Sequence, residues 1–174
     1  VFMVGVIVGL VFLTLTGVLL IKDLDQPKRF FYVLLRPHWN SWLVKGGYSI
    51  TFFGLFLTIS GLAIYFDIKL KVVLSIMSIT TLFAFITSVY TAFLFKQAKG
   101  RDLWQSPVLV WHMLIHSIMA GSAVFCLLIG FMGFPEEYIE YFKFTMVGSL
   151  LVNLLLVIVE FKLLKHSADS KKAL

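Results

Sequence analysis

The 174-residue chain is too apolar to be a soluble domain. Sixty per cent of its residues are hydrophobic and only 14% are charged, with a mean hydropathy of +0.96, whereas a soluble domain is roughly half apolar and about a quarter charged. This composition and the formal net charge of +6 predict a protein of the lipid membrane with basic loops, and we expect no nucleic-acid partner. The single cysteine, Cys126, excludes an intrachain disulfide and an iron–sulfur or zinc site built from cysteines of this chain.

Five apolar stretches follow one another along the chain, each long enough to cross the roughly 30 Å hydrocarbon layer as a helix. They cover about residues 2–21, 42–66, 70–95, 108–132 and 140–164. The alternation of apolar and polar residues that a membrane β-barrel requires is absent from the sequence. We therefore predict an all-α, polytopic transmembrane helical bundle in which residues 1–174 form a single domain.

The connections between these stretches differ in length. The longest, residues 22–41, contains Pro27 and Pro37, which discourage one continuous helix, and between them the sequence FFYVLL, which we expect to lie in the membrane interface. The connection at 67–69 predicts a tight turn. Because the sequence begins at Val1 without an initiator methionine and is already apolar there, we expect at least one further helix upstream. The first apolar stretch lacks the basic start of a signal peptide.

The charged residues divide between two membrane faces if the spans alternate in direction. Residues 22–45, 96–102 and 160–172 hold twelve basic and five acidic residues, whereas 67–71 and 136–143 hold three basic and four acidic ones. The positive-inside rule would place the more basic face in the cytoplasm. A basic surface can equally be a docking site for an acidic protein, so the sidedness of the chain stays open.

Most polar residues inside the spans are serines and threonines. We interpret their hydroxyls as packing groups that bond back to their own helices, rather than as a polar pathway. Asn153 is the deepest amide of the chain. Its expected role is an interhelical hydrogen bond, with a place on a proton path as the alternative.

Ionisable groups at membrane depth are costly and therefore point to function. With Asn153, the expected proton path comprises Lys45, His116 and Glu160. His112 and His116 are four residues apart and share one side of a helix, but a metal site would lack a third ligand. Two histidines on one side also cannot ligate one haem from opposite faces, so haem would need another ligand such as His38. No metal site is predicted.

Tyr90 and His112 flank the charged turn between the third and fourth spans. At about 1.5 Å per residue, each lies about 8 to 9 Å below that turn, a depth suited to the ring of a quinone, whose carbonyls a phenol or an imidazole can hydrogen-bond. Trp42, Trp104 and Trp111 fall at the same edge, where they form either an aromatic belt or the walls of a quinone pocket. For His112, an interfacial histidine beside Trp111 is an equally good interpretation.

Two segments carry recognisable motifs. The first starts at Asp23 and reads D-L-x-x-P-x-R-F, then R-P, then S-W, followed by a small residue, Gly46; the second starts at Tyr90 with Y-T and continues as K-G-R-x-L-W-x-S-P up to Pro107. In this order and spacing they resemble the two signatures of the NrfD/PsrC family, the quinone-interacting membrane subunits of polysulfide reductase, nitrite reductase and alternative complex III. Ala92 stands where many members have glycine.

The resemblance implies that the five spans correspond to helices two to six of a longer bundle in a prokaryotic inner (cytoplasmic) membrane. It also implies that the chain binds menaquinone or ubiquinone as a substrate and exchanges electrons with a ferredoxin-like iron–sulfur subunit, which alone holds the 4Fe–4S clusters. Further membrane and catalytic subunits, with molybdopterin or multihaem cytochrome c, would complete the complex. In the family, the tyrosine matching Tyr90 lines the quinone pocket, and the loops matching 22–41 and 96–107 face the iron–sulfur subunit on the periplasmic side.

These inferences define two sets of candidate residues. The expected quinone contacts are Tyr90, His112, Trp42, Trp111 and Asp23. The expected docking residues are Lys28, Arg29, Arg36, Lys99, Arg101 and Trp104. Because the sequence contains no phosphate loop, nucleophile elbow or catalytic carboxylate pair, the chain is expected to act as a respiratory subunit with no catalytic residue of its own. A di-haem cytochrome b-type anchor and a non-redox transporter or channel subunit are the alternatives.

Overall fold

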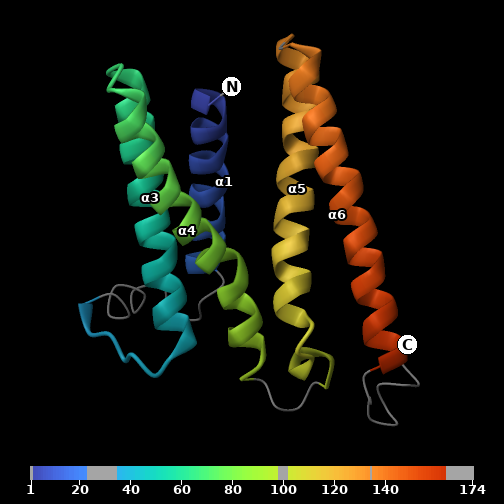
Figure 1. The fold of residues 1–174 in the computed structure, drawn as a ribbon. Coiled ribbons are helices and arrows are strands. Elements are labelled where there is room, and N and C mark those ends of the chain that lie inside the picture. Colours follow the sequence, from blue (N-terminus) through green and yellow to red (C-terminus); the bar gives the residue numbers. More distant parts are fainter. Residues whose placement is uncertain (1, 23–34, 98–101, 134, 164–174) are drawn as a thin grey trace. The chain divides into compact units, whose positions relative to one another are not determined.

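Five long helices form the chain in a computed structural model that describes residues 2–22, 35–97, 102–133 and 135–163 (Figure 1). They are α1 (Phe2–Lys22), α3 (Trp42–Tyr65), α4 (Leu70–Phe95), α5 (Leu109–Met132) and α6 (Glu136–Leu163), and a short 3₁₀ helix, η2 (Asp102–Gln105), precedes α5. Each long helix is apolar and long enough to cross a membrane. The predicted all-α transmembrane architecture is confirmed.

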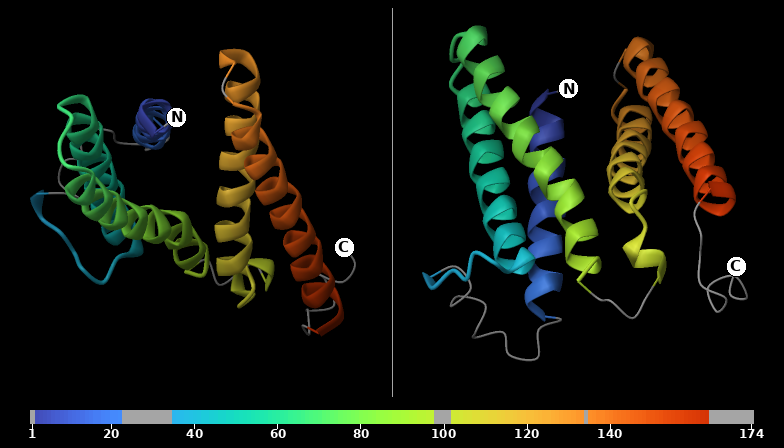
Figure 2. Two further views of the ribbon diagram at one scale, coloured as in Figure 1. Left: turned by 45° about the horizontal axis from the view of Figure 1, so that its top comes forward. Right: turned by 60° about the horizontal axis from the view of Figure 1, so that its bottom comes forward.

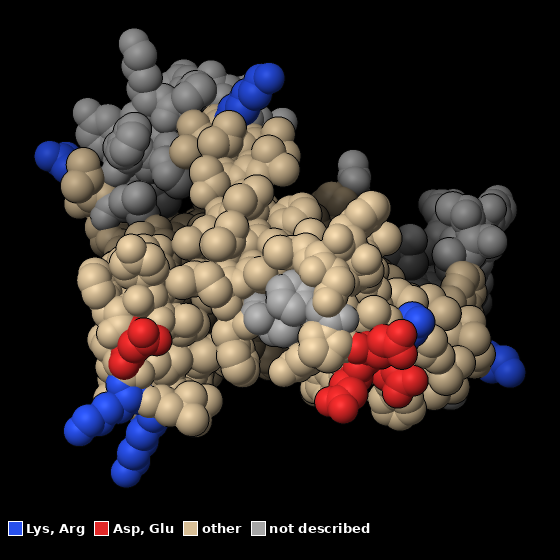
Figure 3. All heavy atoms as spheres, turned by 90° about the horizontal axis from the view of Figure 1, so that it is seen from above, with Lys and Arg blue, Asp and Glu red and all other residues tan. Residues whose placement is uncertain are grey.

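The last helix begins one turn earlier than the sequence suggested, at Glu136 instead of near residue 140. Glu136 and Glu137 occupy its first turn and Lys162 its last, so charges of the favourable sign lie at both ends of the helix dipole. Pro135 precedes the helix, and its carbonyl accepts a hydrogen bond from the Tyr138 amide at 3.1 Å. Acidic side chains gather over this turn in the view from above (Figure 3).

The chain divides into two compact units, Val1–Tyr90 and Thr91–Leu174. In the first unit α1 runs antiparallel to α3, and glycines on α3 make room for side chains of α1. A Cβ atom at Gly61 would lie 2.9 Å from Val6 Cγ1, and one at Gly54 would lie 3.0 Å from Leu13 Cδ2. Small residues at such positions let membrane helices approach closely, which is how helices associate where lipid removes the usual hydrophobic driving force.

The helices α3 and α4 form an antiparallel hairpin in the same unit (Figure 2). Hydroxyl groups bridge the two helices at two levels, between Ser49 and Thr87 at 2.7 Å and between Ser60 and Thr80 at 3.1 Å. Between these levels the ring of Phe83 packs against two phenylalanine rings of α3. The hairpin is therefore held by paired hydroxyls and stacked rings, both of which fix its register.

The turn of this hairpin is closed by Asp67, whose backbone is left-handed with φ of 51°. The Ile68 amide donates to the Ala63 carbonyl at 3.0 Å, and the Asp67 amide donates to the Ile64 carbonyl at 3.3 Å. These two bonds are the Schellman pattern, which satisfies carbonyls that the end of a helix would otherwise leave open. The chain thus reverses within residues 66–69, as the short connection predicted.

In the second unit α5 and α6 pack along a heptad-like seam (Figure 2). The buried side chains of α5 are His112, Ser122 and Ile129, whose spacings of ten and seven residues keep them on one side of the helix. The positions of α6 that face this seam are Phe142, Ser149, Asn153 and Glu160, spaced by seven, four and seven residues, which again keeps them on one side of the helix. At its far end Phe142 stacks on Phe125, with ring centroids 4.7 Å apart.

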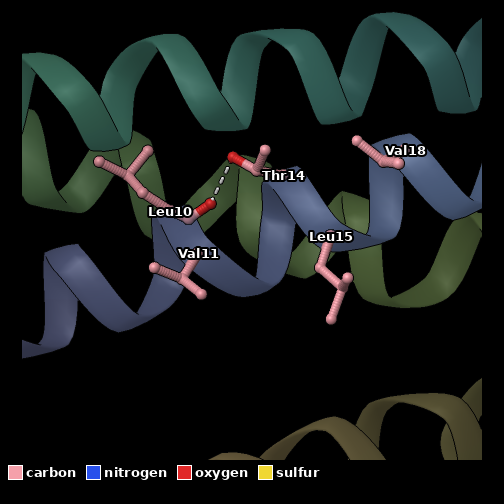
Figure 4. Close-up of a pocket in the computed structure, with 5 residues that line it drawn as sticks. All are labelled: Leu10, Val11, Thr14, Leu15 and Val18. Carbon is pink, nitrogen blue, oxygen red and sulfur yellow. Dashed lines mark hydrogen bonds between the residues drawn. The ribbon is translucent and has the colours of Figure 1, made fainter.

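Away from these contacts the helices are covered with exposed apolar side chains. On α1, Val6 is the only buried residue of the described helix. An open hollow of about 470 Å³ runs along α1 and is lined by Leu10, Val11, Thr14, Leu15 and Val18 (Figure 4). The Thr14 hydroxyl donates to the Leu10 carbonyl at 2.7 Å, so these lining residues present an apolar surface suited to lipid tails or to further apolar helices.

We expect Asp67→Gly to raise the melting temperature of the protein, because glycine relieves the left-handed strain of a residue that carries a Cβ atom, by roughly 1 kcal/mol. Lys69→Gly in the same turn is the matched control, since Asp67 is the one residue other than glycine with a positive φ in the described ranges. Thermal unfolding in a mild detergent is the measurement. Equal shifts at the two positions would contradict this account of the turn.

Candidate functional site

Tyr90 lies near the end of α4, with its ring against the backbone of α3. The residue is 9% exposed, and a Cβ atom at Gly46 would overlap the Cδ2 and Cε2 atoms of its ring. Only glycine at position 46 allows this contact without a shift of the helices or of the ring. The small residue of the first motif and the tyrosine of the second therefore touch each other.

The hydroxyl of Tyr90 has no hydrogen-bond partner among the described residues. One turn earlier on α4, the Thr87 hydroxyl is already paired with Ser49. The ring of Tyr90 is thus held by packing, and within the described ranges no side chain pairs with its phenol. A buried phenol normally finds a partner, so this group is suited to bind a ligand that carries an acceptor oxygen.

A second polar cluster joins α5 to α6 around His112, which is 8% exposed. Its Nδ1 atom lies 2.9 Å from Asn153 Oδ1, and its Nε2 atom lies 3.3 Å from Glu160 Oε2. The first contact has the geometry of a hydrogen bond. The second is within ion-pair distance, yet the direction of approach leaves Nε2 without a properly aligned hydrogen bond. We read it as a charge contact that a small rotation of the carboxylate would align.

His116 lies one turn further along α5 and is exposed. Its ring centroid is 5.8 Å from that of His112, and the rings are tilted by 48°. In the described ranges no three histidine, cysteine, aspartate or glutamate side chains are placed to hold a metal ion. The HxxxH spacing therefore gives neighbouring rings, and only His112 joins the seam.

The tryptophans of the basic edge lie in different surroundings. The Lys45 ammonium lies 4.4 Å from the centre of the Trp42 ring, a cation–π contact that keeps an exposed lysine at the helix start. Trp104, on η2, stacks on Phe95 with centroids 4.7 Å apart. Trp111 is 57% exposed, as expected for a ring of an aromatic belt.

The predicted docking loops fall largely outside the described residues. This is the case for Asp23, Lys28, Arg29, Lys99 and Arg101. Arg36 is exposed. Close to the second loop, Gln105 Nε2 donates to the Lys96 carbonyl at 3.1 Å, which ties η2 to the chain just after α4. The predicted charged turn thus includes a 3₁₀ helix that the sequence did not indicate.

Tyr90 belongs to the first unit and His112 to the second, so their expected convergence on one quinone stays a prediction. The pairing of Asn153 and Glu160 with one histidine was not foreseen from the sequence, which placed them on a proton path one by one. Their seven-residue spacing, which puts both on one face of a helix, was the signal that could have revealed it.

The family model described as polysulphide reductase, NrfD, matches residues 1–173. This chain belongs to the NrfD family. The resemblance of its two motifs is confirmed, and the membership makes the chain a multi-pass membrane subunit of a redox complex, in a family whose members generally work with iron–sulfur and catalytic subunits. No curated protein and no solved structure matches the chain at a significant level.

We expect Gly46→Ala to lower the melting temperature by an amount equivalent to about 1 to 3 kcal/mol, because the new methyl group overpacks against the Tyr90 ring. Gly121→Ala is the control, since a Cβ atom there meets nothing within 4 Å among the described residues. The double variant Gly46→Ala/Tyr90→Ala should recover part of the loss, because contacting residues couple. Strictly additive losses would argue against the contact.

Proposed function

We propose that this NrfD-family chain is the quinone-reactive subunit of its complex. It would bind menaquinone or ubiquinone in a prokaryotic cytoplasmic membrane and exchange electrons with an iron–sulfur partner. The observation that carries the proposal is the environment of Tyr90. Its ring packs against Gly46, while its hydroxyl has no partner among the described residues. The motif membership of both residues and the family match support it.

Quinone reduction requires mainly that the protein position the quinone ring and supply protons to it. A quinone that becomes a quinol takes up two electrons and two protons, so its site needs apolar walls for the ring, a donor for a carbonyl oxygen and a nearby source of protons. In this proposal Tyr90 is the donor. The remaining proposed contacts of the quinone are Trp42, Trp111, His112 and Asp23. The proposed proton path consists of Lys45, Asn153, Glu160 and His116.

Haem is a poor fit to the two histidines of α5. Both ring nitrogens of His112 already face polar groups of α6, and axial ligation would require one of these contacts to be given up. The other described histidine of α5, His116, is on the same side of the same helix. We therefore place the redox centres in a partner subunit and treat quinone as the substrate of this chain.

Tyr90→Phe is expected to leave assembly and melting temperature unchanged but to slow quinone turnover about fivefold or more, the value of one buried hydrogen bond of about 1 kcal/mol. The ring that packs on Gly46 is retained, so the change isolates the hydroxyl. Steady-state quinol oxidation or quinone reduction by the assembled complex is the measurement. Wild-type rates over the full range of quinone concentrations would remove Tyr90 from the site.

We further propose that the basic face docks the iron–sulfur subunit. Lys28, Arg29, Arg36, Lys99, Arg101 and Trp104 are the proposed contacts. The support is the charge difference between the two faces of the chain and the exposure of Arg36. Basic loops of this kind attract an acidic protein partner.

Replacing Arg29 and Arg101 with glutamate should release the iron–sulfur subunit, more readily as salt concentration rises, because added salt screens the remaining exposed charge pairs. Co-purification in mild detergent at two ionic strengths measures this. Lys69→Glu/Lys71→Glu, on the opposite membrane face, is the matched control and should retain the partner. Retention by both variants would count against docking at the basic loops.

A further inference from the structure

Two hydroxyl groups beside Tyr90 depart from the rule that the other hydroxyls of the first unit follow. In the described helices of that unit, every other serine and threonine donates to a carbonyl three or four residues earlier, at 2.7 to 3.0 Å. Ser49 on α3 and Thr87 on α4 instead contact each other, with their oxygens 2.7 Å apart. Because lipid accepts no hydrogen bond, this departure calls for an explanation.

The Ser49–Thr87 pair has one hydrogen more than its own contact can use. Two hydroxyls carry two hydrogens, and the single hydrogen bond between them uses one, whichever oxygen accepts it. Within the described residues neither hydroxyl has another partner. Ser49 is 5% exposed, and a donor left unsatisfied in a buried position costs stability. The surplus hydrogen is therefore suited to a ligand that brings an acceptor oxygen.

A second hydroxyl pair on the same seam lacks this surplus. Ser60 and Thr80 contact each other at 3.1 Å, but each also donates to a carbonyl of its own helix, at 2.8 and 2.9 Å. Both hydrogens of that pair thus have acceptors, and the packing of α3 against α4 accounts for it. Packing alone does not require the different arrangement of Ser49 and Thr87.

The Ser49–Thr87 pair lies next to Tyr90 in the hairpin. Tyr90 packs on Gly46 while Thr87 contacts Ser49, so the two contacts are successive levels of the seam. They are three residues apart on each helix, about 4.5 Å along the axis. On the other side of the pair, the ring of Phe83 packs against two phenylalanine rings of α3. A phenol and a hydroxyl therefore occupy adjacent levels, next to a level of aromatic rings.

We propose that the Ser49–Thr87 pair is the second hydrogen-bond donor to the quinone oxygen that Tyr90 binds. The inference rests on the proposed function of the chain as a quinone-reactive subunit. A carbonyl oxygen has two lone pairs, and two hydroxyl donors that occupy them lie about 5 Å apart. The spacing of successive levels on the seam is of this size. The surplus hydrogen thus supplies the second of the two bonds.

The second donor acts mainly on turnover. The quinone oxygen carries more negative charge during turnover than in the oxidised quinone, because electrons arrive on it before or together with protons. A hydrogen bond to a charged acceptor is stronger than one to a neutral carbonyl. The pair donates this bond and keeps its hydrogen, so no covalent bond breaks. Loss of the pair is therefore expected to lower kcat more than the affinity for oxidised quinone.

Steady-state quinone turnover by the assembled complex, with equilibrium binding of the oxidised quinone to the same preparations, tests the proposal. Short-chain menaquinone and short-chain ubiquinone are the probes. The double variant Ser49→Ala/Thr87→Val should lower kcat about fivefold or more and change Kd by about twofold or less. Thr87→Ser retains a hydroxyl and should keep the wild-type kcat. Ser60→Ala/Thr80→Val is the matched control, since it removes two hydroxyls from the same seam, and should keep both constants.

The single variants decide the matter if the double variant fails to assemble. Only the hydroxyl that accepts within the pair has its hydrogen free for the quinone. One of Ser49→Ala and Thr87→Val should therefore turn over slowly, and the other should stay close to the wild type. Equal rates in the two single variants would contradict the proposal.

Two further results would overturn it. Wild-type turnover in Ser49→Ala/Thr87→Val would remove the second donor, and an equal loss in Ser60→Ala/Thr80→Val would show that hairpin packing sets the rate. Tyr90→Phe separates this inference from the proposed function. Slow turnover in Tyr90→Phe beside wild-type turnover in the hydroxyl variant refutes the pair alone, whereas wild-type turnover in Tyr90→Phe refutes the quinone site and the pair with it.

Discussion

Lipid offers no hydrogen-bond partner, and this constraint determines where the polar side chains of the described helices lie. Hydroxyls on exposed faces turn back onto their own helix: Thr14, Thr51 and Ser117 each donate to the carbonyl four residues earlier, at 2.7 to 2.9 Å. Hydroxyls that face another helix pair across it, as Ser49 does with Thr87. The interpretation of the serines and threonines as packing groups is confirmed by these bonds, and a continuous polar pathway of hydroxyls is not needed to explain them.

At two places a polar side chain is not fully hydrogen-bonded by the described residues, and a function is proposed for both. The Tyr90 hydroxyl has no partner in the described ranges although its ring is buried. At His112, one nitrogen is well bonded and the other faces a carboxylate without an aligned hydrogen bond. Polar groups held by packing but incompletely satisfied cost stability in an apolar medium. The proposed quinone contacts Tyr90 and His112 are therefore groups that the described residues leave incompletely satisfied.

The two units use different means to hold these groups in place. In the first unit, small residues bring helix backbones close, so the position of the Tyr90 ring depends on the absence of a single methyl group at Gly46. In the second, larger side chains meet along a seam, and the polar bridge from His112 to Asn153 and Glu160 fixes the register of α5 against α6. A polar group at a seam position commonly specifies register at some cost in stability.

The sequence by itself determined the membrane environment, the five helices and the family. Length and apolarity decide whether a stretch spans a bilayer, and the two loop motifs are local in the chain. It also predicted which residues were chemically notable, from Tyr90 to Glu160. The start of α6 was misplaced, because an exposed first turn with Glu136 and Glu137 belongs to the helix although it is polar.

Contacts between distant residues were decided only by the tertiary structure. The close approach of Tyr90 to Gly46 joins positions 44 residues apart, and His112 meets Asn153 and Glu160 across a turn. Helical periodicity gives the face on which a residue lies but not the partner that this face meets. That partner depends on the register in which two helices pack, and the register is the joint result of every contact along them.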